Sequence, residues 1–223
     1  MLLLMMWKEV QVGSWRRRDF AARRARWVGA AAVIPRGAAL AVSPGSEEEG
    51  SVDITIRRAG LEDAEGMTRV HLESWRSSYR GLLPQEYLEG LDFEERLAGW
   101  RRGLADPDAG VFVAEEPDTG RIVGLCAVGK NRPPPESLPG YRGELYAIYL
   151  VEEVKRRGVG RALFQRGTGW LRENGLVPFI LWVLKDNAAA RGFYERLGGR
   201  LGGEQWIELG GHSYAEVAYV WEA

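Results

Sequence analysis

A basic turn punctuated by glycines, placed directly before a predicted helix, is the strongest chemical signal in this sequence. The turn spans 155–160, with the sequence KRRGVG, between an apolar segment at 144–151 and a helical pattern at 159–173. The first N–H groups of a helix lack partners within it, the helix dipole adds positive charge, and glycine leaves room for phosphate oxygens. The turn therefore predicts a binding site for a pyrophosphate.

Two other phosphate-binding motifs do not fit this turn. A Walker loop needs Gly-Lys-Ser or Gly-Lys-Thr after four intervening residues, and the turn has neither. A dinucleotide-binding fingerprint needs a small residue three positions after Gly160, where Leu163 stands, and it usually opens a βαβ unit rather than lying late in the chain. A dinucleotide-binding protein is therefore disfavoured, and tight binding of NAD would be needed to restore that interpretation.

Three segments together resemble the GNAT superfamily of N-acetyltransferases. Segment 155–160 is similar to the family's Gln/Arg-x-x-Gly-x-Gly/Ala signature, with Lys155 at the first position. Segment 187–198 resembles a second family block, in which an Asn, an Ala and a Phe-Tyr-Glu run precede Leu-Gly, and segment 71–83 resembles the split first helix of many bacterial members. The resemblance covers about 52–221. It implies an α/β fold with a mixed, largely antiparallel sheet, a central splay and flanking helices.

The resemblance also implies a reaction and a co-substrate. Members of the family transfer an acetyl group from acetyl-CoA to a primary amine, which attacks the thioester directly in a ternary complex, without a metal. The acyl donor would lie in a cleft between the strands at 144–151 and 178–184. The residues expected to bind it are Tyr149, Leu150, Val151, Lys155, Arg156, Arg157, Gly158, Val159, Gly160, Arg161, Asn187 and Tyr194. Two histidines and one cysteine also argue against a zinc site.

Two side chains are candidates for proton transfer. Tyr194 matches the tyrosine that protonates the leaving thiolate in the family, and the alternative is a core tyrosine. Glu144 is the candidate base, because it lies on the cleft strand among apolar residues, where burial suits a carboxylate to proton transfer. The alternative for Glu144 is a solvated acid at the strand end, and Tyr146 is a weaker candidate base. Backbone N–H groups near Tyr149 and Leu150 would stabilise the oxyanion.

Aromatic residues are the candidates for the acceptor pocket, namely Trp75, Tyr79, Tyr146 and Trp182. Such residues are common in protein cores, so a core role is the alternative. Asn187 would either contact the acyl donor or cap the helix that follows it. The acceptor, a small-molecule amine or a protein amine, has no readable motif. An acyl-CoA-binding sensor without turnover is the alternative function, and the presence of both Tyr194 and Glu144 argues against it.

The elements that must position these residues follow from hydrophobic periodicity. It predicts strands at 53–57, 111–114, 122–128, 144–151, 178–184, 200–208 and 213–221, and helices at 61–79, 85–102, 159–173 and 187–197. The strand at 144–151 is largely apolar on both faces, which predicts that both are buried. Turn residues predict a hairpin at 117–120, and four prolines with two glycines predict a loop at 131–143.

Composition limits the class of protein and its partners. Hydrophobic residues make up 45% and charged residues 27%, as in soluble globular proteins, and a net charge of −1 gives no basis for a nucleic-acid partner. Cys126 is the only cysteine, so no disulfide forms within the chain, which fits the cytoplasm. No segment has the length of a membrane span, which gives no basis for a membrane partner. Many relatives dimerise, so the resemblance allows a homodimer.

Residues 1–52 differ in composition from the remainder. Basic residues outnumber acidic ones there, whereas the reverse holds in 53–223, and the stretch 43–49 reads as a linker. We therefore expect the N-acetyltransferase domain at 53–223, and at 1–52 a poorly ordered extension or upstream sequence from a misplaced start. One alternative is an export signal, since residues 17–20 resemble a twin-arginine motif, although an exported enzyme would lack an obvious supply of acetyl-CoA; the other is an Arg-rich transit peptide.

Overall fold

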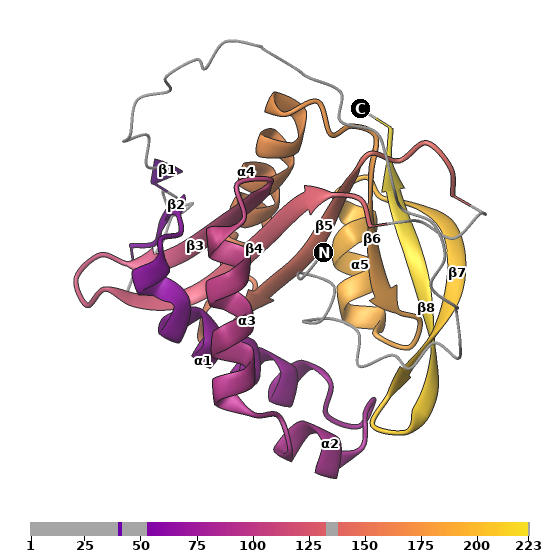
Figure 1. Cartoon of the computed structure of the whole chain (residues 1–223), viewed down its shortest axis with the longest axis horizontal. Coiled ribbons are helices and arrows are strands. Elements are labelled where there is room, and N and C mark those ends of the chain that lie inside the picture. Colours follow the sequence, from indigo (N-terminus) through magenta and orange to yellow (C-terminus); the bar gives the residue numbers. More distant parts are fainter. Residues whose placement is uncertain (1–39, 42–52, 133–137, 223) are drawn as a thin grey trace, which may run out of the picture.

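The computed structural model describes residues 40–41, 53–132 and 138–222, and within these ranges eight strands form a single sheet (Figure 1). The predicted linker and the twin-arginine-like segment lie outside the described residues. Leu40 and Ala41 pair with the strand at 55–58, with Leu40 opposite Ile56. The boundary expected between 1–52 and 53–223 stays a prediction.

The secondary-structure elements largely follow the sequence periodicity. In chain order they are β1 (Leu40–Ala41), β2 (Thr55–Arg58), a 3-10 turn (Leu61–Asp63), α1 (Ala64–Ser78), α2 (Gln85–Glu89), α3 (Phe93–Ala105), β3 (Ala109–Glu116), β4 (Arg121–Lys130), β5 (Gly143–Leu150), a second 3-10 turn (Glu152–Val154), α4 (Val159–Glu173), β6 (Phe179–Leu184), α5 (Ala188–Arg196), β7 (Arg200–Leu209) and β8 (His212–Trp221). None of the helices in the described ranges combines the length and the apolar character needed to cross a membrane.

The sheet has the strand order β1-β2-β3-β4-β5-β6-β8-β7. Every neighbouring pair is antiparallel except β5 and β6, which run parallel. α1 and α3 cover one face of the sheet, and α4 and α5 lie against the other (Figure 1). The predicted fold class, a mixed and largely antiparallel sheet with flanking helices, is therefore confirmed.

The parallel strands β5 and β6 stay paired over only two residues each. Gly143 lies opposite Phe179 and Glu144 opposite Ile180, and no further partners follow in the described chain. Gly143 is needed at the junction, because a Cβ there would lie 2.2 Å from the carbonyl oxygen of Leu176. Beyond Glu144 the two strands separate, which produces the expected splay in the middle of the sheet.

The separation of β6 also changes the burial of β5. Its first three residues are buried, but Tyr146, Ile148 and Leu150 are only half-buried, while the alternating residues between them are buried. The prediction that both faces of 144–151 are buried is therefore wrong for the second half of the strand. Because a period of two separates the faces of a strand, one face stays in the core and the other is left at the splay.

The helix predicted at 85–102 is two helices, and that prediction is wrong as a single element. α2 ends at Glu89, with Gly90 at its C-terminus. α3 then begins anew after Asp92, whose side chain accepts a hydrogen bond from the backbone N–H of Glu95 at 2.7 Å. An aspartate in this position satisfies an unpaired N–H of the first turn, so it favours a new helix start over a continuous helix.

The hairpin between β3 and β4 confirms the turn predicted at 117–120. Both Thr119 and Gly120 donate a backbone hydrogen bond to the carbonyl oxygen of Glu116, and Gly120 has φ = 68°. Glycine tolerates this left-handed conformation without steric cost, which is why it closes the turn.

Candidate active site

A cleft of about 920 Å³ opens where β5 and β6 separate. Its walls come from β5, β6, α5, the turn before α4 and the C-terminal end of α1. The predicted site residues that line it are Tyr79, Tyr146, Tyr149, Leu150, Lys155, Arg156, Gly158, Gly160, Arg161, Trp182, Asn187 and Tyr194. The fold thus brings together two segments, 144–161 and 187–194, that the sequence separates.

The second half of β5 presents backbone groups to this cleft. The N–H of Val151 donates to the carbonyl oxygen of Val123 at 3.0 Å, so Val151 directs its backbone groups towards β4. Successive residues of a strand direct theirs to alternate edges, so Ile148 and Leu150 face the edge that β6 leaves open. These two residues can therefore form hydrogen bonds with an extended ligand lying in the cleft.

The N-terminus of α4 faces the same cleft. Gly158 precedes the helix in a left-handed conformation (φ = 85°, ψ = −16°), and no side chain of the described residues caps the helix there. The first N–H that bonds back within the helix is that of Ala162, to the carbonyl oxygen of Gly158 at 3.0 Å. The N–H groups before it have no acceptor inside the helix, so they are available to an anion.

Gly158 and Gly160 serve different structural purposes. A Cβ at Gly158 would meet no described atom within 4 Å, so only its positive φ requires glycine. A Cβ at Gly160 would instead lie 3.2 Å from Leu150 and 3.4 Å from Phe193. Gly160 therefore permits close packing of α4 against β5 and α5, and Gly158 shapes the turn that faces the cleft.

Lys155 connects the turn to α1. Its Nζ donates to the hydroxyl of Ser78 at 3.1 Å and pairs with Glu152 at 2.7 Å. Ser78 is the last residue of α1, so the basic turn is tied to the opposite wall of the cleft. This contact gives a structural reason for a cation at the position where Lys155 departs from the family signature.

Three residues predicted to bind the acyl donor lie outside the lining of the cleft. Val151 and Val159 are buried in the core, and the side chain of Arg157 is exposed. Sequence reasoning also missed Ser74, Ser77 and Arg196, which do line the cleft. Helical spacing relates these serines, since Ser74 lies three residues before Ser77 and four before Ser78, and residues at these spacings are neighbours on a helix surface.

Tyr194 of α5 lies close to two other buried tyrosines, Tyr149 of β5 and Tyr79 at the end of α1. Burial, and then the proximity of Tyr149, raises the pKa of Tyr194 above its ordinary value. Burial also raises the pKa values of Tyr79 and Tyr149. A tyrosine with a raised pKa stays protonated at neutral pH, so Tyr194 can donate a proton to a group in the cleft. Its proposed role as an acid stays a prediction.

Asn187 caps α5, which was one of its two predicted roles. Its side-chain oxygen accepts a hydrogen bond from the N–H of Ala190 at 3.1 Å. The residue is buried and also lines the cleft. Its amide NH₂ group remains the part that could contact a ligand.

Glu144 lies in a buried ion pair rather than in the lining of the cleft. It is 2% exposed, and both of its carboxylate oxygens contact the guanidinium of Arg132. The backbone N–H of Arg132 donates to Glu144 as well, at 3.2 Å. A carboxylate engaged in this way is less available as a base, so the geometry does not favour the role predicted for Glu144, which remains untested.

Tyr146, the other candidate base, lines the cleft but is also engaged. Its hydroxyl donates to the carbonyl oxygen of Lys130 at 2.5 Å. Burial, and then the negative charge of Glu144, raises the pKa of Tyr146 above its ordinary value. A phenol that is already a donor and that resists ionisation is a poor proton acceptor at neutral pH.

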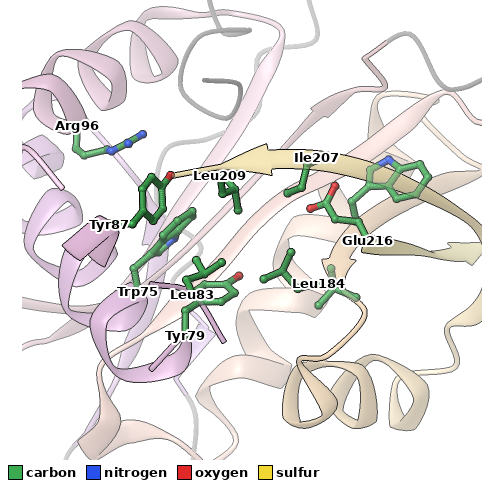
Figure 2. Close-up of a pocket in the computed structure, with 11 residues that line it drawn as sticks. Trp75, Tyr79, Leu83, Tyr87, Arg96, Leu184, Ile207, Leu209 and Glu216 are labelled. Carbon is green, nitrogen blue, oxygen red and sulfur yellow. The ribbon is translucent and has the colours of Figure 1, made fainter. Parts of the chain in front are cut away.

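A second pocket adjoins the cleft and gathers most of the predicted acceptor-binding aromatics (Figure 2). Trp75, Tyr79 and Trp182 line it, and the rings of Trp75 and Tyr79 lie 4.9 Å apart. Tyr79 and Trp182 also line the cleft, so the two spaces share part of their walls. Sequence reasoning missed Tyr87, Arg96 and Glu216 in this pocket.

His71 lies beneath this pocket as a core residue. It is 1% exposed, and its ring is 4.8 Å from that of Tyr149 and 5.5 Å from that of Trp75. Burial, and then the charge of Arg96, lowers the pKa of His71 to about 3. His71 is therefore neutral at physiological pH. Among the described residues, no group of three or more His, Cys, Asp or Glu side chains could hold a metal ion.

Comparison with known proteins places the chain in a family. Residues 70–199 match the Acetyltransferase (GNAT) family. The uncharacterized N-acetyltransferase YuaI of Bacillus subtilis (strain 168) is 37% identical over 169 residues, which cover 75% of this chain and 92% of YuaI. A mycothiol acetyltransferase of Amycolatopsis mediterranei (strain U-32) is 38% identical over 109 residues, which cover 48% of this chain and 35% of that protein.

A solved structure supports the same assignment at the level of the fold. The ribosomal-protein-alanine N-acetyltransferase of Brucella melitensis superposes with a TM-score of 0.59 and 22% identity, and the match covers 75% of this chain and 99% of that chain. The chain therefore belongs to the GNAT family of acetyltransferases. It is an acetyl-CoA-dependent N-acetyltransferase, which confirms the resemblance of segments 155–160 and 187–198.

Proposed function

We propose that the chain transfers the acetyl group of acetyl-CoA to a primary amine by direct attack in a ternary complex. The observation that carries this proposal is the N-terminus of α4, which Gly158 leaves without a side-chain cap among the described residues. It faces a cleft that the separation of β5 from β6 opens. An anion site and an open strand edge in one cleft match a donor that has a pyrophosphate at one end and amide groups along its arm.

The described residues fit such a donor. The volume of about 920 Å³ lies within the usual range for ligand sites. The N–H groups at the start of α4, with Arg156 and Arg161 beside them, would hold the pyrophosphate. The backbone groups of Ile148 and Leu150 would bind the amides of the pantetheine arm as a neighbouring strand does.

The chain's own groups would then assist the transfer. The amine nitrogen forms a bond to the thioester carbon while the carbon–sulfur bond breaks, and negative charge develops on the carbonyl oxygen. The N–H of Leu150, on the open edge of β5, is a donor for that oxygen. Tyr194, which lines the cleft, would give its proton to the leaving thiolate.

The acceptor does not follow from the relatives, because their names point to different molecules. One relative is a mycothiol acetyltransferase and one structural neighbour a ribosomal-protein-alanine N-acetyltransferase. A small-molecule amine and a protein amine are therefore both within the proposal. No observation favours a sensor without turnover, since Tyr194 lies in the cleft.

Location and assembly are further proposals. The cytoplasm is proposed because Cys126 is a buried free thiol, which is compatible with a reducing compartment. A homodimer is proposed from the family alone. The domain is proposed to span 53–223, since the family match at 70–199 lies inside it.

Initial-rate kinetics test the proposed reaction. Release of the coenzyme A thiol would be followed while acetyl-CoA and a primary amine are varied together. Direct attack in a ternary complex gives intersecting double-reciprocal lines, whereas a covalent acetyl-enzyme gives parallel lines. Parallel lines, or the absence of thiol release with every amine, would contradict the proposed mechanism.

A further inference from the structure

The strand β7 has an unpaired outer edge along its 10 residues in the described chain. It pairs with β8 on one side only, and Figure 1 shows it at the outer side of the sheet. The edge of a strand presents N–H and C=O groups that can pair with a further strand. β7 can therefore accept a strand of a second molecule.

Two large apolar side chains are exposed on this strand. Leu201 is 60% exposed and Trp206 is 70% exposed, and within the described ranges only Leu61 is a comparably exposed large apolar residue. Tryptophan contributes a large contact area and is enriched among the residues that carry the binding energy of interfaces. The unpaired edge and these two side chains together form a candidate contact surface for another protein.

Leu201 and Trp206 lie on the same face of the sheet, although they are five positions apart in the sequence. Leu201 is opposite Tyr219 and Trp206 is opposite Ala215, and residues four apart on β8 share a face. A register shift at Gly202 inserts one extra residue between the two, which restores a common face.

Glu204 lies midway between them on this face. It is opposite Val217 of β8, so Leu201 and Trp206 are each two pairing positions from it, one on either side. A two-fold axis at Glu204 would place Leu201 of each copy opposite Trp206 of the other. Among antiparallel registers that match the faces of the two strands, only this one does so.

The charges at this axis compensate one another. Two copies of Glu204 would lie directly opposite, and like charges in that position are destabilising. Each Glu204, however, forms an ion pair with Lys185 of its own chain at 2.8 Å. Two such pairs bring two carboxylates and two ammonium groups to the axis, so the charge there sums to zero.

We propose that two copies of this chain associate through β7, with the two β7 strands antiparallel about Glu204. This is the surface of the homodimer proposed above, on which the inference rests. The two sheets become continuous across the axis, and Trp206 covers Leu201 of the partner subunit. Because one strand and two apolar side chains from each copy make a small interface, we expect a dissociation constant on the order of 10 μM.

Analytical ultracentrifugation tests the role of Trp206. We expect the unmodified protein to pass from monomer to dimer between about 1 and 100 μM, and Trp206→Ser to weaken the dimer about tenfold or more. Leu61→Ser is the matched control, because Leu61 is 60% exposed but lies in the 3-10 turn before α1. That change should leave the dimer unaffected.

Cysteine substitution tests the register. Glu204→Cys puts a thiol on the axis, where the Cα atoms of the two copies come within the roughly 4.4–6.8 Å that a disulfide requires. Glu208→Cys is the control, because its two copies would lie eight positions apart, or roughly 27 Å. Under mild oxidation we expect a covalent dimer of Glu204→Cys and none of Glu208→Cys. The native thiol of Cys126 is buried and does not compete.

The outcomes separate this inference from the proposed homodimer. If the unmodified protein stays monomeric at about 100 μM, both are overturned. If it dimerises but Trp206→Ser dimerises equally well, the assignment of β7 alone is overturned. The same holds if Glu204→Cys gives no more covalent dimer than Glu208→Cys.

Discussion

The Nζ of Lys155 lies 3.1 Å from the hydroxyl of Ser78, so the basic turn before α4 is joined to the last residue of α1 across the mouth of the cleft. Lys155 thereby combines a charge near the proposed pyrophosphate site with a tie between two walls. Its contribution to ligand binding should exceed that of an exposed lysine.

Replacement of Lys155 tests this double role. Lys155→Met should weaken acetyl-CoA binding about tenfold, because it removes a cation and releases the turn from Ser78. Ser78→Ala, which keeps the charge, should weaken it by a smaller factor. Calorimetric titration measures both, with Lys130→Met as the control, since Lys130 forms an exposed pair with Asp108. Equal affinity of Lys155→Met and the unmodified protein would show that the tie is irrelevant to binding.

Gly158 should be sensitive to any side chain for conformational reasons. Its φ of 85° is unfavourable for alanine, so Gly158→Ala should destabilise the native protein by about 1 kcal/mol or distort the turn, and acetyl-CoA affinity should fall. Gly169→Ala is the matched control within α4, where no described atom lies within 4 Å of the added Cβ. That change should be neutral or stabilising, because alanine favours helix. Thermal unfolding measures the stability of both variants, and titration with acetyl-CoA measures their affinity for the donor. Equal stability and equal affinity of the two variants would contradict this prediction.

Tyr194→Phe should separate binding from turnover. The substitution keeps the ring in the buried cluster and removes only the hydroxyl, so acetyl-CoA affinity should stay the same. If the hydroxyl protonates the thiolate, kcat should fall about 100-fold. Steady-state kinetics beside calorimetry measure the two quantities. An unchanged kcat would assign Tyr194 to the core alone.

His71 should make the protein sensitive to acid. The unfolded chain takes up a proton at His71 below about pH 6.5, whereas the native protein does so only near pH 3. The unfolded state therefore binds more protons in this window, so stability falls as pH decreases from 6.5 towards 3. Above pH 6.5 this contribution is fully present.

Replacement of His71 isolates this contribution. His71→Phe keeps an aromatic ring against Tyr149 and cannot be protonated, so its free energy of unfolding should depend less on pH between 3 and 6.5. Urea unfolding at several pH values measures the difference. An identical pH dependence in both proteins would mean that other groups cause the acid sensitivity.

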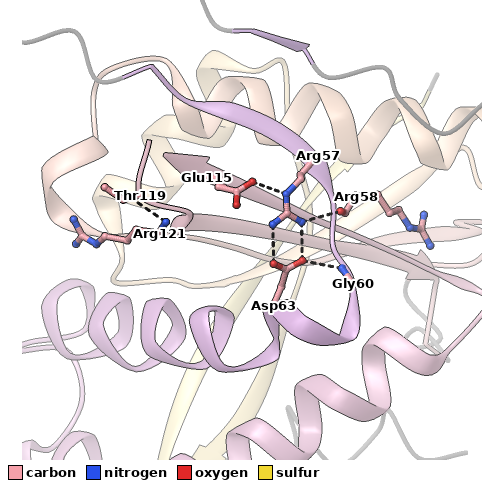
Figure 3. Close-up of polar contacts among 7 residues, drawn as sticks. All are labelled: Arg57, Arg58, Gly60, Asp63, Glu115, Thr119 and Arg121. Atoms are coloured by element: carbon pink, nitrogen blue, oxygen red, sulfur yellow. Dashed lines mark hydrogen bonds and ion pairs between the residues drawn. The ribbon is translucent and has the colours of Figure 1, made fainter. Parts of the chain in front are cut away.

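Asp63 should contribute more to stability than a surface acid. Figure 3 shows it between Arg57, which donates to both of its oxygens at 2.7 and 2.8 Å, and the N–H of Gly60 at 2.8 Å. Burial opposes ionisation of Asp63, but these hydrogen bonds outweigh it and lower its pKa. Asp63→Ala should cost about 2 kcal/mol of unfolding free energy. Asp108→Ala, which removes an exposed pair with Lys130, should cost at most about 1 kcal/mol, and similar losses would contradict this ranking.

The sequence allowed good prediction where the signal is local. The helix expected at 159–173 has those bounds in the structure, because Gly158 and the apolar periodicity after it define the start and the face of α4. Likewise Asn187 marks the start of α5 through its own side chain. The splay between β5 and β6 was predicted from family resemblance rather than from residues, and Gly143 explains only the close approach of the chain where the two strands still pair.

Interactions between distant residues were not predictable from the sequence. Glu144 has apolar neighbours in the sequence, but its partner Arg132 lies 12 residues earlier, in the loop between β4 and β5, so the ion pair gives no local signal. Glu216 lies on the last strand and meets residues of α1, α2 and α3 only in the folded protein. The break before α3 was readable in principle, since Asp92 is followed three residues later by Glu95, a pattern typical of a helix start.

Calorimetric titration of the unmodified protein with acetyl-CoA, with NAD and ATP as controls, tests the central claim most directly. If the start of α4 and the open edge of β5 bind the donor, acetyl-CoA should bind with micromolar affinity or better, and NAD and ATP should give no signal. A folded sample that does not bind acetyl-CoA, or that binds NAD or ATP equally well, would contradict the assignment of the cleft.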